Sequence, residues 1–325
     1  MKGKSVIAVK SVGAAVAALT LACAPVTLAP ETDDPGTTWV ADVGSSRVIK
    51  INKACSAFVA SSPDLGRPVA VLFDSYNGYC WAADAEGGRI IRLTSRAVVE
   101  KTLYGFGEPV ALAYCPKENA VWVADRGQGR IVKLTERGTV RAELGGLNEP
   151  AAIAVNPLNG EVFVACAAVV VRTDRWGQPL GRYYGFDRPA ALAFDAGYGY
   201  LWVADTGNGR VVRLKPSGEV VAVSNALAAP TAVAVNPRTG FAFAADAAAG
   251  KVVSVRGDGS LRWANTEYER PTALAVNPTD MSLWVADSYS FSVYKLKGNT
   301  GAASDYESVA GLADPVALFT DPGIR

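Results

Sequence analysis

The tetrapeptide Trp-Val-Ala-Asp occurs four times in this chain, at residues 39–42, 122–125, 202–205 and 284–287. Three variants continue the series, and they are Trp81–Asp84, Phe163–Cys166 and Phe243–Asp246. The last residues of the seven segments, at positions 42, 84, 125, 166, 205, 246 and 287, lie 39 to 42 positions apart. A fixed period of this length indicates a repeat architecture.

A second sequence pattern recurs with the same period. Each unit opens an apolar stretch with a proline followed two positions later by alanine, and most of these stretches end at Asn or Asp. The seven prolines are Pro68, Pro109, Pro150, Pro189, Pro230, Pro271 and Pro315. Glycine-rich turns separate the apolar stretches, which is typical of short antiparallel strands.

Four strands can be placed in each unit, and we name them a to d in chain order. The expected bounds, taken from two adjacent units, are 150–155 for a, 120–125 and 161–166 for b, 130–134 for c and 139–144 for d. A single four-stranded sheet of this kind has two apolar faces, so several sheets must pack around an axis to cover them. The pattern therefore predicts an all-β, seven-bladed β-propeller of four-stranded antiparallel blades.

The two ends of the chain fit together in this arrangement. The first repeat begins on strand b at Trp39, and the last apolar stretch, 315–320, is a strand a. We expect this C-terminal strand to join the N-terminal blade and close the ring, which leaves no open sheet edge. A six-bladed ring is the alternative, and it would require discarding the Cys166 unit.

The units resemble the NHL repeat, in which an apolar strand after proline is followed by a Val-Ala-Asp-like strand end and a polar turn into arginine. The segment Asp205–Arg210 is the closest instance, and the resemblance spans residues 39–321. Two units depart from it: Ala167 and Ala168 replace the Gly-Arg turn beside Cys166, and the segment Ser288–Ser292 replaces it after Asp287. The resemblance implies a propeller of bacterial, exported type.

Residues 1–23 are typical of an export signal. Three lysines, Lys2, Lys4 and Lys10, precede a run of small and apolar residues, 11–22, that is too short to span a bilayer. The run ends in Thr-Leu-Ala-Cys, which is similar to the bacterial lipobox, and this resemblance implies lipidation of Cys23. We therefore expect a membrane-anchored lipoprotein of the cell envelope.

Cleavage after Ala24 by the general signal peptidase is the alternative, and it would give a periplasmic or secreted soluble protein. Pro25 directly follows that site and disfavours the cleavage. Residues 24–36 hold three prolines and three acids and are predicted to form a flexible tether. The propeller is then expected to occupy residues 37–325.

Composition excludes several classes of function. The chain has no histidine, which removes Ser-His-Asp triads, His-ligated zinc and His-ligated haem. With 32 basic and 31 acidic side chains, it has no charge excess that would favour a nucleic-acid partner. Half of the residues are hydrophobic, which is enough for a large core. We expect no cofactor and no metal.

Some repeated residues have structural explanations. Small alanines suit the crowded axis, and the large aromatic of strand b fills the space where blades diverge. The Asp that ends strand b is predicted to accept backbone N–H groups of the following turn, with Arg or Lys five positions later as its partner. Besides Cys23 there are four cysteines, Cys55, Cys80, Cys115 and Cys166, which we expect to be buried free thiols; a Cys55–Cys80 disulfide is the alternative.

Function is therefore sought where the units differ. The residue before each strand-a proline lies in the loop between strands d and a, at one mouth of the central channel. In ring order these residues are Arg67, Glu108, Glu149, Arg188, Ala229, Arg270 and Asp314. The turns between strands b and c should open on the same face and add Arg126, Tyr289 and Phe291. These are residue types enriched in binding hot spots, although a variable solvated rim would look similar.

Strand a supplies little chemistry, because Tyr114 is its one tyrosine and its interior has no lysine or carboxylate. The leading hypothesis is thus a non-catalytic binding scaffold, a monomer that holds a protein, peptide or glycan and touches the membrane only through a lipid anchor. The alternative is a divalent-metal-dependent hydrolase similar to gluconolactonase-like propellers, using Glu108, Glu149 and Asn148. A purely structural envelope module is a third possibility. Streptogramin lyases and peptide-amidating lyases depend on histidine, which this chain lacks.

Overall fold

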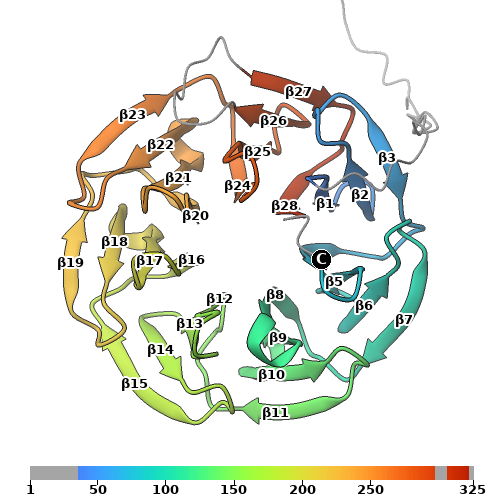
Figure 1. Ribbon diagram of the computed structural model, residues 1–325, viewed down its shortest axis with the longest axis horizontal. Helices are drawn as coiled ribbons and strands as arrows, with labels where there is room; N and C mark the ends of the chain where they lie inside the picture. The colour runs from blue at the N-terminus through green and yellow to red at the C-terminus, as the bar shows by residue number, and fades with distance from the viewer. Residues whose placement is uncertain (1–35, 297–305, 322–325) are drawn as a thin grey trace, which may run out of the picture.

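The computed structural model describes residues 36–296 and 306–321, and these form seven four-stranded antiparallel sheets arranged in a ring (Figure 1). Strand a of each sheet lies at the channel and strand d at the rim. The predicted fold class is confirmed, and so is the number of blades. Among the described residues, no helix is long and apolar enough to cross a membrane.

The strands of each blade follow in the order a to d. Blade 1 has β28 (Pro315–Thr320), β1 (Thr38–Asp42), β2 (Arg47–Ile51) and β3 (Phe58–Ser61). Blade 2 has β4 (Pro68–Asp74), β5 (Tyr79–Asp84), β6 (Arg89–Leu93) and β7 (Val99–Tyr104). Blade 3 has β8 (Pro109–Cys115), β9 (Ala120–Asp125), β10 (Arg130–Thr135) and β11 (Val140–Leu144). Blade 4 has β12 (Ala152–Val155), β13 (Val162–Ala165), β14 (Val169–Thr173) and β15 (Pro179–Tyr184).

The remaining blades repeat this plan. Blade 5 has β16 (Pro189–Asp195), β17 (Tyr200–Asp205), β18 (Arg210–Leu214) and β19 (Val220–Val223). Blade 6 has β20 (Pro230–Val235), β21 (Ala242–Asp246), β22 (Lys251–Val255) and β23 (Leu261–Asn265). Blade 7 has β24 (Pro271–Val276), β25 (Leu283–Asp287), β26 (Ser292–Leu296) and β27 (Tyr306–Ala310). Short 3-10 turns complete the description: η1 (Pro116–Glu118), η2 (Arg126–Gln128), η3 (Thr206–Asn208) and η4 (Ala247–Ala249).

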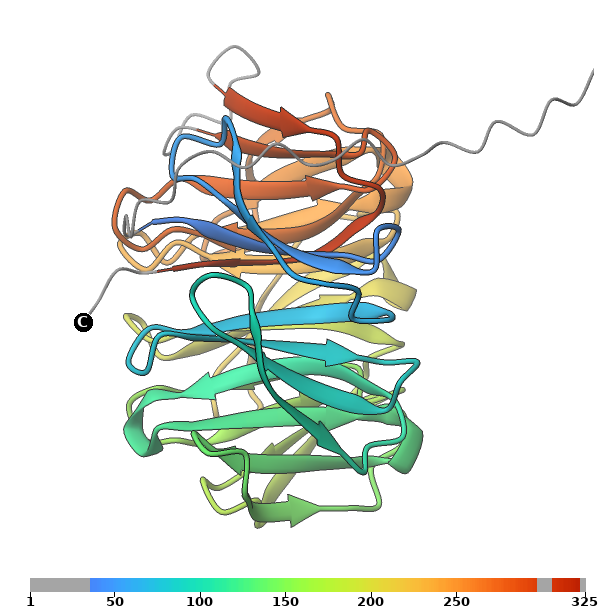
Figure 2. The same ribbon diagram turned by 90° about the vertical axis from the view of Figure 1, so that its right-hand side faces the viewer.

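The C-terminal strand closes the ring as predicted. β28 pairs antiparallel with β1, and the register joins Thr38 to Thr320 and Val40 to Leu318. Figure 2 shows the red C-terminal strand alongside the blue N-terminal one. Closure brings the d–a loop before β28 next to the end of β1, and this contact forms part of the site described below.

The core lies between neighbouring blades. One cluster, for example, combines Trp122 and Ile131 of blade 3 with Val162 and Val171 of blade 4, all at most 1% exposed. Removing each such large apolar side chain from water contributes about 1.5–3 kcal/mol. Strand b is buried on both faces for this reason, which explains its continuous apolar sequence.

A second inter-blade contact was not anticipated from the sequence. In each blade whose strand b carries Trp, a Lys or Arg of strand c stands over that ring and donates to a carbonyl in the c–d turn of the next blade. Lys133 lies over Trp122 and donates to the Arg175 carbonyl at 2.7 Å. The other four cations are Lys50, Arg92, Arg213 and Lys295, which donate to carbonyls of Ser95, Glu136, Gly257 and Lys53. These cations therefore fasten one blade to the next.

The cysteine prediction is confirmed for the described residues. Cys55, Cys80, Cys115 and Cys166 are buried and unbridged. The alternative Cys55–Cys80 disulfide is wrong. Burial raises the pKa of the Cys55 thiol to about 12 and that of Cys166 to about 11, so both are protonated and unreactive.

Candidate functional site

The d–a loops and b–c turns open at the same mouth of the channel, which we call the loop mouth. The Asp at the end of strand b holds them in place. Asp125 accepts hydrogen bonds from the Gly107 and Glu108 backbone N–H groups, both at 2.9 Å. The sequence predicted that the donor N–H groups would belong to the following b–c turn. Most of them belong instead to the preceding d–a loop, which contacts the end of strand b only in the folded ring.

The predicted partner five positions later is present in four blades. Arg89 Nε lies 2.7 Å from Asp84, and Arg210 Nε lies 2.8 Å from Asp205. Blade 4 has Cys166 in place of the Asp. Blades 1 and 7, which are neighbours, keep the Asp and lack its partner: Arg47 makes no ion pair with Asp42 in the described structure, and Ser292 stands five positions after Asp287. The b–c turns of this sector are therefore free of the Asp–Arg pair.

One group of predicted site residues lies on blades 3 and 4. Arg126 donates from Nε to the Glu108 carboxylate at 2.9 Å, and a second bond from the same guanidinium reaches the other oxygen. This bidentate pair holds the pKa of Glu108 below its ordinary value. Glu149 is exposed, and its negative charge helps to raise the pKa of the Arg126 guanidinium. Arg188, in the next d–a loop, is exposed and paired with Asp187 at 3.4 Å.

A second group lies on blades 7 and 1. Arg270, Tyr289 and Phe291 line one pocket of about 270 Å³ together with Ser288, Ala313 and Asp314. We call it the Arg270 pocket. The Arg270 guanidinium stands 5.5 Å from the centre of the Tyr289 ring, and the Tyr289 and Phe291 side chains are 61% and 51% exposed. Glu108 and Arg126 line no part of this pocket, so the predicted residues fall into two sectors of the mouth.

The sequence placed Asp314 only among the seven residues that precede the strand-a prolines. Its environment makes it the most distinctive titratable group of the pocket. Its backbone N–H donates to Asp42 Oδ1 at 2.5 Å. Partial burial raises the pKa of the Asp314 carboxyl, and the negative charge of Asp42 raises it further, while Arg270 and Arg67 oppose the shift. A carboxyl with a raised pKa in a small pocket is suited to proton transfer.

Ser288 adds a hydroxyl to the same pocket. Its side chain is 5% exposed, and its Oγ has no hydrogen-bond partner among the described residues. Its backbone N–H donates to the Arg270 carbonyl at 3.1 Å, which fixes the start of the turn against the neighbouring d–a loop. A buried hydroxyl without a partner has a donor and two lone pairs available for a ligand.

Phe291 occupies a position that glycine fills in four other blades. Its φ is 53°, and Gly88, Gly129, Gly209 and Gly250 have φ of 58–60°. A Cβ at those glycines would meet a d–a loop carbonyl oxygen at 2.5–2.7 Å. A left-handed conformation costs a non-glycine residue about 1–2 kcal/mol. A strained, half-exposed aromatic side chain therefore points to a role other than folding.

Most other aromatic residues in or beside the d–a loops do not face the mouth. Phe186 and Tyr268 are 8% and 7% exposed and pack between blades. Tyr104 and Tyr184 are 72% and 74% exposed, but they belong to strand d at the rim. The aromatic contribution to the mouth thus comes mainly from the blade 7 turn.

The residues proposed for a divalent cation do not fit one. Both carboxylate oxygens of Glu108 accept from Arg126, and that guanidinium also faces Glu149. A cation placed there would compete with a fixed positive charge. In the described part of the chain, no group of three or more Asp, Glu or Cys side chains converges on a point.

Fold and site together define a seven-bladed β-propeller with a small pocket of mixed charge and aromatic character at one channel mouth. No protein-family model matches the chain, and no curated protein matches it. Solved structures do match. A streptogramin B lyase aligns with a TM-score of 0.68 at 15% identity, over 79% of this chain and 88% of the lyase.

Two further solved structures align with this chain over nearly their whole length. A candidate 6-phosphogluconolactonase from Bacteroides uniformis has a TM-score of 0.72 at 16% identity, over 88% of this chain and 99% of its own. A protein of unknown function from Desulfotomaculum acetoxidans has a TM-score of 0.72 at 12% identity, over 87% and 98%. At these identities the likeness shows the fold.

The prediction of a non-catalytic binding scaffold is corrected here, because the solved structures with this fold include lyases and a candidate lactonase. The physical reason is the place where chemistry was sought. Chemistry was sought in the apolar channel strands and at Glu108 and Glu149, whereas the carboxyl with a raised pKa, Asp314, lies in another loop of the same mouth.

Proposed function

We propose that this chain is a hydrolase of small lactones or esters that carry a negative charge, and that the Arg270 pocket is its active site. The observation that carries the proposal is the combination in one pocket of a carboxyl with a raised pKa, a guanidinium and a buried hydroxyl without a partner. In ester hydrolysis these groups could serve as a general base, an oxyanion stabiliser and a hydrogen-bond donor.

Each group has a role in the proposed reaction. A water molecule attacks the carbonyl carbon while the Asp314 carboxylate accepts one of its protons. Arg270 stabilises the oxyanion that forms, and Ser288 donates a hydrogen bond to the substrate. The C–O bond then breaks, and Asp314 returns the proton to the departing alkoxide, so that a lactone yields a hydroxy acid. The raised pKa of Asp314 brings it nearer the operating pH of a general base.

The charges of the pocket set the substrate class. Arg270 and Arg67 both lower the pKa of Asp314, so both act on the same small region. Their positive potential favours an anionic substrate, and the exposed faces of Tyr289 and Phe291 offer apolar contact to a ring. A pocket of about 270 Å³ has room for a small molecule.

The lack of histidine in this chain favours a hydrolase over a lyase among the activities of the structural neighbours. One neighbour is virginiamycin B lyase from Staphylococcus aureus, in a form made catalytically inactive by replacing a histidine with alanine. The present chain has no histidine. The metal-dependent route of the gluconolactonase-like alternative is not adopted, because the Glu108 and Glu149 carboxylates do not fit a cation. We expect activity to persist in the presence of a chelator.

A substrate screen with one matched pair of variants tests the proposal. The screen uses a pH-stat and aldonolactones with and without a carboxylate or phosphate group. We expect turnover of charged lactones, and a loss of about 10²–10⁴-fold in kcat/KM for Asp314→Asn. Glu149→Gln is the matched control, since Glu149 holds the same repeat position on blade 4. The proposal fails if no lactone or ester is hydrolysed, or if both variants lose the same activity.

We also propose that the chain is exported and anchored through Cys23, and that its blades are of the NHL type. Both proposals rest on the sequence, and residues 1–35 lie outside the described residues. Cys23→Ala should abolish metabolic labelling by a palmitate analogue and move the protein into the aqueous phase of a detergent partition. Labelling that persists in the variant would reject the anchor. A monomer without a nucleic-acid partner remains a prediction.

A further inference from the structure

Blade 1 departs from the repeat at the aspartate that ends its strand b. In blades 2, 3, 5 and 6 this buried aspartate pairs with an Arg or Lys five positions later, at 2.7–3.5 Å. Asp42 is also buried, at 1% exposed, yet it makes no ion pair with Arg47 in the described structure. Its Oδ2 accepts a hydrogen bond from the Ser45 hydroxyl at 2.6 Å instead. A hydroxyl brings no positive charge, so the negative charge of Asp42 is not balanced by an ion pair.

The same carboxylate holds the loop that carries Asp314. The Asp314 backbone N–H donates to Asp42 Oδ1 at 2.5 Å, and the Ala313 N–H lies within 3.1 Å of both oxygens. In return, the Val43 N–H donates to the Asp314 carbonyl at 2.9 Å. A Cβ at Gly44 would lie 2.8 Å from the Ala313 carbonyl carbon, so the two segments are in close contact. The position of Asp314 at the pocket wall therefore depends on Asp42.

Charged groups from three neighbouring elements act on the Asp314 carboxyl. Asp42 lies at the end of β1, and Arg270 and Arg67 lie in the loops before β24 and β4. Partial burial raises the pKa of Asp314 most, Asp42 raises it further, and the two arginines lower it. Asp42 is the acidic member of this set, and a negative charge close to a carboxyl favours its protonated form.

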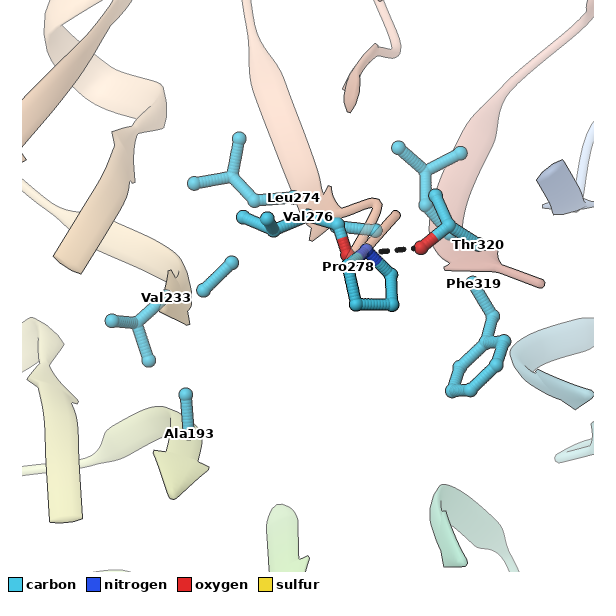
Figure 3. Close-up of a pocket in the computed structure, with 10 residues that line it drawn as sticks. Ala193, Val233, Leu274, Val276, Pro278, Phe319 and Thr320 are labelled. Atoms are coloured by element: carbon cyan, nitrogen blue, oxygen red, sulfur yellow. Dashed lines mark hydrogen bonds between the residues drawn. The ribbon is translucent and has the colours of Figure 1, made fainter. Parts of the chain in front are cut away.

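The channel adds no charged group to this set. A second pocket, of about 330 Å³, is lined by the a strands of blades 5, 6, 7 and 1 and by Pro278. Figure 3 shows its aliphatic side chains and the Phe319 ring around one space. Thr320 is the one polar side chain of this lining, and its hydroxyl donates to the Val276 carbonyl at 3.0 Å. The charge around Asp314 is therefore set by residues of the loop mouth.

We propose that Asp42 is a positioning residue of the Arg270 pocket, which fixes the Asp314 backbone at the pocket wall and supplies a negative charge that makes Asp314 a stronger base. The proposal rests on the proposed hydrolase, in which Asp314 accepts the proton of the attacking water. Asp42 is buried and lines no part of the pocket, so it acts through Asp314 and not on the substrate.

The first measurement needs no substrate. Carbon NMR follows the titration of the Asp314 side-chain carboxyl, whose signal is assigned by its loss in Asp314→Asn. Asp42→Asn keeps an oxygen that can accept from the Ala313 and Asp314 N–H groups, and it removes the charge. We expect the midpoint of the Asp314 titration to move to lower pH in Asp42→Asn.

Asp205→Asn is the matched control, because Asp205 holds the same repeat position in blade 5. It accepts from the Asp187 backbone N–H at 2.8 Å, and its carboxylate is paired with Arg210. This variant should leave the Asp314 titration unchanged. Ser45→Lys is a second test, which applies even if Asp42→Asn does not fold. It leaves Asp42 in place and adds the positive charge that blade 1 lacks, so it should also move the Asp314 midpoint to lower pH.

The second measurement is the dependence of kcat/KM on pH in lactone hydrolysis. The rising limb should move to lower pH in Asp42→Asn and in Ser45→Lys, and the plateau should fall because Asp314 becomes a weaker base. A purely structural role of Asp42 would lower the plateau without moving the limb.

Two results of the NMR titration would overturn the proposal. One is an Asp314 midpoint that stays in place or rises in Asp42→Asn and Ser45→Lys, and the other is an equal displacement in Asp205→Asn. If the midpoint moves as expected but no lactone is hydrolysed, the proposed function fails while the action of Asp42 on Asp314 is supported.

Discussion

Lys133 offers a quantitative test of how the blades are held together. Its side chain is fully buried, and its ammonium group forms an ion pair with Glu118, donates to the Arg175 carbonyl at 2.7 Å and stands 5.5 Å and 5.1 Å from the centres of the Trp122 and Trp176 rings. Lys133→Met keeps the stem and removes the charge. Breaking a buried ion pair by removing one partner costs about 3–5 kcal/mol.

The lower end of that range is expected here. Glu118 keeps a second partner in Arg175, whose Nε lies 3.4 Å from its carboxylate. We therefore expect Lys133→Met to lower the free energy of unfolding by about 3 kcal/mol. In a domain of this size that corresponds to a fall in Tm of about 5 °C. Denaturant and thermal unfolding of wild type and variant measure the change.

The matched control is Lys215→Met. Lys215 also pairs with a glutamate, Glu219, at 2.9 Å, but both side chains are about half exposed. An exposed pair of this kind contributes little to stability, because water and salt screen it. The double variant Lys133→Met, Glu118→Leu should recover much of the lost stability, because it removes both buried charges. The reasoning is refuted if Lys133→Met costs no more than Lys215→Met.

Three further predictions follow from closure, from the thiols and from Asp314. Deleting residues 314–325 removes β28 and exposes the edge of β1 that β28 covers, so the truncated chain should aggregate or melt much earlier than the full chain in a thermal scan; an unchanged Tm would reject the shared blade. The thiols of Cys55 and Cys166 should react with a maleimide only after unfolding, because burial raises both pKa values; rapid labelling of the native protein would contradict this. The raised pKa of Asp314 means that its carboxyl favours the folded state below the ordinary pKa of 3.8 and opposes folding as the pH rises through the folded-state pKa. Asp314→Asn should therefore stabilise the protein at pH 7 and not at pH 3. Urea unfolding measures both, and stabilisation at pH 3 alone would show the sign to be wrong.

Much of the fold could be predicted from the sequence because the same physical constraint recurs in each unit. A large aromatic residue is needed where blades diverge, and a small one where they converge. Strand bounds agreed closely where turn residues flank them, as at Ala120–Asp125, which was predicted to the residue. Closure followed from the unit that is split between the two ends of the chain.

The cations of strand c could not be predicted in the same way. A Lys or Arg in a strand is usually read as a solvent-facing residue. Lys133 is buried only because a carbonyl of the next blade and a glutamate of its own a–b turn both meet it. The Arg175 carbonyl lies 42 positions along the chain and is brought beside Lys133 only by the packing of the two blades.

The candidate site shows the same limit. The positions of Arg270, Tyr289 and Phe291 at one mouth were predicted from strand order, and the structure places them around one pocket. The character of Asp314 was not predictable, because its pKa depends on Asp42, which is 272 positions away and is brought beside it by closure. Conversely, Glu108 was considered as a cation ligand in the alternative hydrolase, but its carboxylate is paired with Arg126.

The dependence of kcat/KM on pH tests the central claim most directly. If Asp314 acts as the general base, lactone hydrolysis by the wild type should rise with pH through a single pKa that lies above 3.8, because the carboxylate form is the active one. Asp314→Asn should lose this rising limb, and Glu149→Gln should retain it. A wild-type profile without the limb, or one that survives in Asp314→Asn, would contradict the assignment of the Arg270 pocket as the active site.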